Sequence, residues 1–171
     1  MYKNLLSPDL CDTLIEKFEE AEAKHTKTET ADFNEVNIVS EAWEEVLTIA
    51  ERFSELVDVY CKAVNIDEDV QFPPQTLWEQ FRIKKYKKDQ QQFKPHTDNA
   101  EDRILAFFVY LNDVEEGGET HFPLHKAQVR PQKGAALVFP CTWEYLHEGK
   151  TPLSNDKYIL GGYLRGTNAE G

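Results

Sequence analysis

Three side chains in the second half of the sequence have the types and spacing of a metal-binding set. His96 and Asp98 are two residues apart, so on an extended segment both would leave the same face, and His147 supplies a second imidazole. Two neutral imidazoles and one carboxylate can occupy one face of an octahedral Fe(II) ion and leave the other positions open. Lys157, ten residues beyond His147, offers a fixed cation for an acidic cosubstrate. Together these residues indicate redox chemistry.

Neither part of this set is diagnostic alone. A His-x-Asp tripeptide often occurs by chance in surface turns, and a lysine near the C-terminus usually directs its ammonium to solvent. His121 and His125 are rival ligands in principle, but Pro123 between them breaks the helix that would bring them together. The combination of His96, Asp98, His147 and Lys157 therefore carries the functional interpretation.

Four segments together resemble the prolyl 4-hydroxylase branch of the Fe(II)- and 2-oxoglutarate-dependent dioxygenases, over roughly residues 76–165 and more loosely through the N-terminal part. The segments are 82–86 leading to 93–99, then 103–113, then 117–123, and finally His147 with Lys157. The resemblance implies a mainly β fold with flanking helices (α+β), built on a double-stranded β-helix, which is a jelly-roll or cupin-like barrel. It places His96 and Asp98 near a strand end and His147 on a later strand as the metal ligands.

The resemblance also assigns residues to the cosubstrate. It implies that Lys157 pairs with the distal carboxylate of 2-oxoglutarate and that Tyr86 and Tyr110 contact this molecule. A pocket that removes a carboxylate from water needs a cation such as Lys157, because burying the carboxylate unpaired costs on the order of several kcal/mol. The sequence departs from the family pattern at three places in the surrounding loops and the pocket floor. The glycine that usually follows the tyrosine at position 86 is missing, because Lys87-Lys88-Asp89 follow it, and Asn155 stands where glycine is common. Tyr163 stands where tryptophan is usual.

The implied activity is hydroxylation of a C–H bond in a peptidyl or protein substrate, with proline as the first candidate. The enzyme would bind Fe(II), consume 2-oxoglutarate and O2, and release succinate and CO2. L-ascorbate is a candidate further cofactor. Asp98 argues against a halogenase, which lacks this carboxylate. Two alternatives stay open: a free amino acid or small-molecule hydroxylase, and a non-catalytic cupin-like module that holds a metal such as Zn(II). Lys157 favours the enzyme, and the roles of Arg165, Trp143 and Tyr163 stay open.

Charge and composition narrow the partners. The 171 residues have a net charge of −12, and residues 1–70 contain 18 acidic against 6 basic residues. Such a surface disfavours nucleic acid and anionic membranes. The lysine run at positions 84, 85, 87 and 88 is expected at a solvated strand edge. No apolar run reaches the roughly 20 residues of a membrane span, and residues 1–8 lack the apolar stretch of a signal peptide. Three scattered cysteines predict reduced thiols and a cytoplasmic location.

The element pattern predicts one domain over 1–171, with residues 1–70 as helical support and 71–171 as the β-helix core. We expect helices over about 8–25 and from a Ser40 cap to about 65, and a short strand near 36–39. The second helix would bury Trp43, Val46, Leu47, Ala50, Phe53, Val57, Tyr60, Cys61 and Val64. Strands are expected at 76–86, 103–112, 127–130, 135–139 and 158–165. The sequence does not indicate the oligomeric state.

Overall fold

Two β-sheets face each other in the computed structural model, which describes residues 1–21, 26–27, 33–100 and 102–167. In the large sheet the order is β1-β2-β4-β11-β6-β9, with β3 also pairing with β11, and in the small sheet it is β5-β10-β7-β8. The strands are β1 (Thr26–Lys27), β2 (Asn34–Asn37), β3 (Thr76–Trp78), β4 (Arg82–Tyr86), β5 (Phe93–His96), β6 (Arg103–Tyr110), β7 (Thr120–Phe122), β8 (Ala127–Val129), β9 (Ala136–Pro140), β10 (His147–Gly149) and β11 (Lys157–Gly166). All pairings between these strands are antiparallel.

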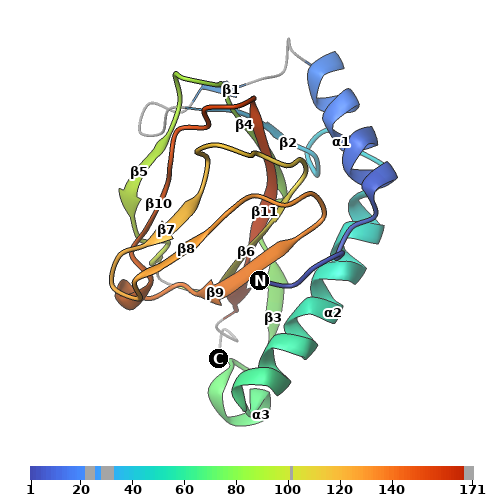
Figure 1. Cartoon of the computed structure of the whole chain (residues 1–171). Coiled ribbons are helices and arrows are strands. Elements are labelled where there is room, and N and C mark those ends of the chain that lie inside the picture. Colours follow the sequence, from blue (N-terminus) through green and yellow to red (C-terminus); the bar gives the residue numbers. More distant parts are fainter. Residues whose placement is uncertain (22–25, 28–32, 101, 168–171) are drawn as a thin grey trace.

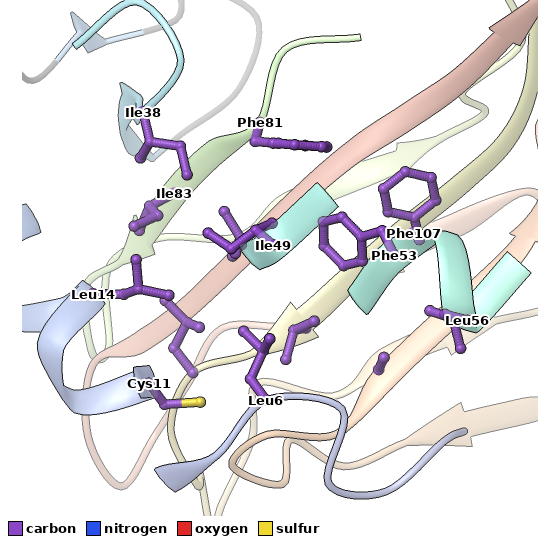
Figure 2. Packing of buried hydrophobic residues seen from close by; sticks show 14 of the residues in the cluster. Leu6, Cys11, Leu14, Ile38, Ile49, Phe53, Leu56, Phe81, Ile83 and Phe107 are labelled. Carbon is purple, nitrogen blue, oxygen red and sulfur yellow. The ribbon is translucent and has the colours of Figure 1, made fainter. Parts of the chain in front are cut away.

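In the described part of the chain, the α-helices cover the large sheet and leave the small sheet uncovered. Figure 1 shows α1 (Pro8–Glu20) and α2 (Val46–Val64) along its outer face, with the short α3 (Glu68–Gln71) at the end of α2, while the small sheet lies on the opposite side of the molecule. The main core fills the layer between helices and sheet, as Figure 2 shows, and there the ring centroids of Phe53 and Phe107 are 4.5 Å apart. Among the described residues, no helix has the length and apolar composition needed to cross a membrane.

Helix α1 begins where the sequence predicts but ends earlier. The Ser7 hydroxyl accepts a hydrogen bond from the Leu10 N–H at 3.2 Å, and Pro8 occupies the first turn, where its missing N–H is not needed. The helix buries Cys11, Leu14 and Phe18 at helical spacing. Its last residue is Glu20, and residues 22–25 of the predicted helix lie outside the described part of the chain.

Helix α2 begins five residues later than predicted, with Glu45 rather than Ser40 at its N-cap, because Asn37 stabilises a competing turn. Its Oδ1 accepts hydrogen bonds from the backbone N–H groups of Val39 and Ser40, so Ser40 does not cap a helix. Ala42 then adopts a positive φ of 52°. The predicted buried stripe was partly wrong. Phe53, Val57 and Cys61 are buried as predicted, and the helix also buries Ile49 and Leu56, which Figure 2 labels in the core. Leu47 and Val64, both expected inside, are instead 76% and 48% exposed.

The strands also differ from the prediction in detail. The segment 76–86 is two strands, and the predicted strand near 36–39 is β2, which spans Asn34–Asn37. Both β1 and β2 belong to the large sheet, so residues 1–70 contribute strands as well as helices. The first half of the lysine run does not lie on a sheet edge, because Lys84 and Lys85 are on β4, an interior strand between β2 and β11, whereas Lys87 and Lys88 follow it as exposed residues. Lys84 faces the space between the two sheets, and Lys85 pairs with Glu19 on the helical side.

Candidate active site

The three predicted metal-binding side chains meet between the sheets. His96 at the end of β5 and His147 at the start of β10 are direct partners across an antiparallel pair, and their ring centroids are 4.2 Å apart. Asp98 follows β5, with one carboxylate oxygen 3.7 Å from His96 Nε2 and the other 3.5 Å from His147 Nε2. The ligand atoms of the three residues all lie within 4.8 Å of one another. This spacing fits a single metal ion with two nitrogen ligands and one oxygen ligand.

Backbone carbonyls fix which nitrogen of each imidazole faces the centre. His96 donates from Nδ1 to the Lys94 carbonyl oxygen at 2.7 Å, and His147 donates from Nδ1 to the Tyr145 carbonyl oxygen at 2.9 Å. Both Nε2 lone pairs are therefore directed at the shared centre, as metal-binding histidines require. Burial, together with the neighbouring His147, lowers the pKa of His96 and keeps its imidazole neutral.

The Asp98 carboxylate is oriented by Tyr163, whose role the sequence left open. The Tyr163 hydroxyl donates to Asp98 Oδ1 at 3.0 Å. Burial, with the charge of Asp98, raises the pKa of Tyr163, so this hydroxyl stays protonated and remains a donor. The Arg103 guanidinium lies 3.5 Å from the centroid of the Tyr163 ring and forms two hydrogen bonds to Glu79, at 2.8 and 2.6 Å. This stack holds the ring in place.

Lys157 is a buried cation on β11 facing the same space. Its side chain is 2% exposed and Nζ donates to the Gly118 carbonyl oxygen at 2.8 Å. Gly118 adopts a φ of 71°, in the left-handed region that glycine accommodates without strain. No carboxylate of the described residues forms an ion pair with Lys157, whose hydrogen-bond acceptor is a backbone carbonyl, and burial lowers the pKa of its ammonium to about 7. An acidic ligand would restore the charged form.

The two predicted cosubstrate tyrosines surround Lys157. Its Nζ lies 4.9 Å from the centroid of the Tyr86 ring and 5.9 Å from that of Tyr110. The Tyr110 hydroxyl and Thr120 Oγ1 are hydrogen-bonded at 2.7 Å. Gly149, on the strand that carries His147, lies next to the ammonium, because a Cβ there would be in van der Waals contact with Nζ at 3.6 Å.

The three metal-binding residues line one open pocket between the sheets, together with Lys157 and Tyr86, whereas Tyr110 does not line it. Sequence reasoning missed several lining residues, although a period of two along strands already identified would have found some of them. Lys84, for example, is two residues from Tyr86, and Tyr163, whose role the sequence left open, is six from Lys157. The full lining is Gln80, Arg82, Lys84, Tyr86, Phe93, His96, Asp98, Ala106, Phe107, Phe108, Thr120, His147, Gly149, Lys157, Ile159, Gly161, Gly162 and Tyr163.

The remaining predicted positions lie elsewhere. Within the described residues, His121 pairs with Glu148 at 2.9 Å and His125 stacks on Tyr145, so neither joins the metal-binding set. Trp143 is 69% exposed in a 3-10 turn, and Arg165 contacts Asp102. Neither residue lines the pocket.

Comparison with known families identifies the β core. Residues 81–165 match the model of the 2OG-Fe(II) oxygenase superfamily. A curated relative from Arabidopsis thaliana, named "Probable prolyl 4-hydroxylase 11", is 41% identical over 75 residues, which cover 40% of this chain and 27% of the relative. The chain thus spans less than a third of the length of the curated relatives that it matches.

Solved structures extend the likeness to the whole fold. A viral collagen prolyl hydroxylase from Paramecium bursaria Chlorella virus-1, solved with 2-oxoglutarate, superposes with a TM-score of 0.75 at 20% identity, covering 97% of this chain and 94% of that one. A Trichoplax adhaerens prolyl hydroxylase, solved with a hypoxia inducible factor peptide fragment, gives 0.70 at 15% identity, covering 95% and 81%. These likenesses confirm the predicted double-stranded β-helix with flanking helices.

Proposed function

Because the chain belongs, through residues 81–165, to the 2OG-Fe(II) oxygenase superfamily and resembles its prolyl 4-hydroxylases, we propose that it is a dioxygenase that hydroxylates a peptidyl C–H bond, with proline the first candidate. Its products would be the hydroxylated peptide, succinate and CO2. One observation carries the proposal: His96, Asp98 and His147 converge on one point in a pocket that also contains the buried, unpaired cation Lys157.

The donor set fits Fe(II). Two neutral imidazoles and a carboxylate, each oriented by a hydrogen bond before any ion arrives, match the requirement of this metal for one occupied face and open positions. When bound with 2-oxoglutarate, Fe(II) supplies the oxidising chemistry that uses O2. The protein's own part is to hold the ligands, position both organic reactants and limit the entry of water. A requirement for ascorbate remains a prediction.

Lys157 is proposed to bind the outer carboxylate of 2-oxoglutarate. The Gly118 carbonyl directs the ammonium, and the rings of Tyr86 and Tyr110 wall it off from water. A dianion with one end at the metal and the other at Lys157 would be fixed at both carboxylates. Tyr86 and Tyr110 contribute apolar walls and keep their hydroxyls protonated, because burial raises the pKa of each.

A peptide is the favoured substrate class. The pocket is open to solvent, and a related fold has been solved with a peptide fragment, although at 15% identity. A free amino acid remains the alternative, and nothing in the charge pattern favours nucleic acid. The location of the protein in a reducing compartment such as the cytoplasm is proposed from Cys11, Cys61 and Cys141, which are all free and buried.

The test is turnover of 2-oxoglutarate to succinate by the protein supplied with Fe(II) and O2, with mass spectrometry of proline-containing peptides for a gain of one oxygen. We expect His96→Ala to abolish turnover by removing the metal, and Lys157→Ala to raise KM for 2-oxoglutarate while metal binding is kept. Lys150→Ala removes a partly exposed lysine that pairs with Glu148 outside the pocket, and it should leave both quantities unchanged. Tight metal binding without succinate formation would instead identify a binding module.

A further inference from the structure

Lys84 is a second cation in the pocket that lacks a carboxylate partner. It is partly exposed and lies on β4 two residues before Tyr86, so both side chains face the pocket. Its Nζ lies 4.8 Å from the centroid of the Phe33 ring and 5.5 Å from that of Phe93. Within the described part of the chain, no carboxylate oxygen comes within 4.0 Å of this ammonium. The faces of these two rings contact the ammonium directly.

The nearest negative charges are engaged elsewhere. Glu35 on β2 is the register partner of Lys84, but its carboxylate lies 3.8 Å from Nε of Arg82. Asp98 accepts the Tyr163 hydrogen bond and belongs to the metal-binding set. Burial lowers the pKa of Lys84, and the attraction of Glu35 and Asp98 opposes this shift. An additional anion in the pocket would favour the charged form.

Lys84 lies close to the metal-binding set. The Phe93 ring, 5.5 Å from Nζ, is stacked on His96 with 3.6 Å between ring centroids, which places the ammonium within about 9 Å of the His96 ring. On β11, Lys157 pairs with Tyr86, and Ile159 pairs with Lys84. The two lysines therefore originate about 8 Å apart, since they differ by the rise of two strand residues, about 7 Å, and by one strand spacing, about 4.8 Å. They are suited to two different anions.

Building on the proposed function, we propose that Lys84 binds a carboxylate of the substrate. Since 2-oxoglutarate has one outer carboxylate and Lys157 is placed to take it, Lys84 is left for the molecule that is hydroxylated. The substrate would then carry its carboxylate within about three residues of the reacting carbon, since each extended residue spans about 3.5 Å. The group belongs either to an Asp or Glu side chain of a peptide or to the main-chain carboxylate of a C-terminal or free amino acid.

The experiment compares neutral and acidic probes of one shape. The first pair consists of blocked peptides with a single proline flanked by Glu or by Gln. The second pair consists of peptides ending in proline with a free carboxylate or an amide, with L-proline as a further probe. Each is assayed for hydroxylation and, under anaerobic conditions with Co(II) and 2-oxoglutarate bound, for binding by calorimetry. The variants are Lys84→Met, which keeps packing on the two rings, and Lys84→Arg, which keeps the charge. Lys85→Met is the control, because that lysine faces the helical side of the same strand.

We expect the wild type to favour the carboxylate member of at least one pair by roughly ten-fold or more in kcat/KM and in affinity, the size expected of a hydrogen bond to a charged group. Lys84→Met should bring the ratio between the carboxylate and the neutral probe to about one, without changing the affinity for 2-oxoglutarate. Lys84→Arg and Lys85→Met should keep the wild-type preference for the carboxylate probe. Equal use of both members by the wild type, or a ratio that survives in Lys84→Met, would overturn the inference. If no probe is hydroxylated, the proposed function fails, and the calorimetric ratio still decides the role of Lys84.

Discussion

The buried ammonium of Lys157 should make 2-oxoglutarate binding take up a proton. The ordinary pKa of a lysine side chain is 10.5, and burial lowers that of Lys157 to about 7. At pH 8, roughly nine in ten ligand-free molecules would therefore carry a neutral amine at this position. Only the charged form pairs with a carboxylate, so binding at pH 8 should take up about 0.9 proton for each 2-oxoglutarate bound.

The size of the effect follows from the same shift. A difference of about 3.5 pKa units corresponds to about 5 kcal/mol of penalty on the charged form before the ligand arrives. Above pH 7 the affinity for 2-oxoglutarate should fall about ten-fold per pH unit until the pKa of the complex is reached. In the protein without ligand, the amine of Lys157 loses its proton near pH 7 in the folded state and near pH 10.5 in the unfolded state. The unfolded state therefore binds more protons between these values, and the contribution of Lys157 to the free energy of unfolding rises with pH over this range.

Calorimetry measures the proton directly. Anaerobic titrations of the Co(II)-loaded protein with 2-oxoglutarate at pH 8, in phosphate and in Tris, should differ in enthalpy by 0.9 times the difference in buffer ionisation enthalpy. Lys157→Arg provides the control, because its guanidinium stays charged throughout this pH range. The uptake and the pH slope should disappear in this variant. Equal proton uptake by both proteins would refute the assignment of the anion site to Lys157.

Three further outcomes follow from named contacts. Tyr163→Phe should weaken Co(II) binding about ten-fold in a competition titration, since it removes the hydrogen bond that orients Asp98, and an unchanged affinity would count against that role. Gly149→Ala should raise KM for 2-oxoglutarate without loss of Tm, because the added methyl would lie 3.6 Å from the ammonium; an unchanged KM would mean that the ligand does not use this space. Ile49→Ala should lower the free energy of unfolding, measured in urea, by about 2 to 4 kcal/mol, because Ile49 is buried. Leu47→Ala should lower it by under about 0.5 kcal/mol, because Leu47 is exposed. Equal losses would contradict the position of the helix face.

The metal-binding set could be predicted because it depends on residue types and on the strand period of two. His96 and Asp98 needed only an extended segment, and the position of His147 came from the family resemblance. The strands that carry them were harder to find, since β7 and β10 have three residues each and are too short to show alternation. The functional chemistry was therefore clearer in the sequence than the small sheet that positions it.

Other errors arose where a side chain bonds to the backbone or where burial depends on distant partners. The late start of α2 depends on Asn37, which bonds to nearby N–H groups outside any helix. The lysine run was expected on an edge because nothing local shows that β2 pairs with β4. That pairing makes β4 an interior strand, and the period of two then turns Lys84 inward and Lys85 outward.

The edge position of β5 has a consequence for the behaviour of the protein without metal. Among the strands that the structure describes, β10 is its only neighbour in the small sheet, and His96 and His147 face each other across that junction. An ion held by the two histidines and Asp98 would fasten the outer strand through its side chains, in addition to the backbone ladder. We therefore expect chelation to let this rim fray first, so that amide exchange quickens in 93–98 before the helix-covered sheet loosens.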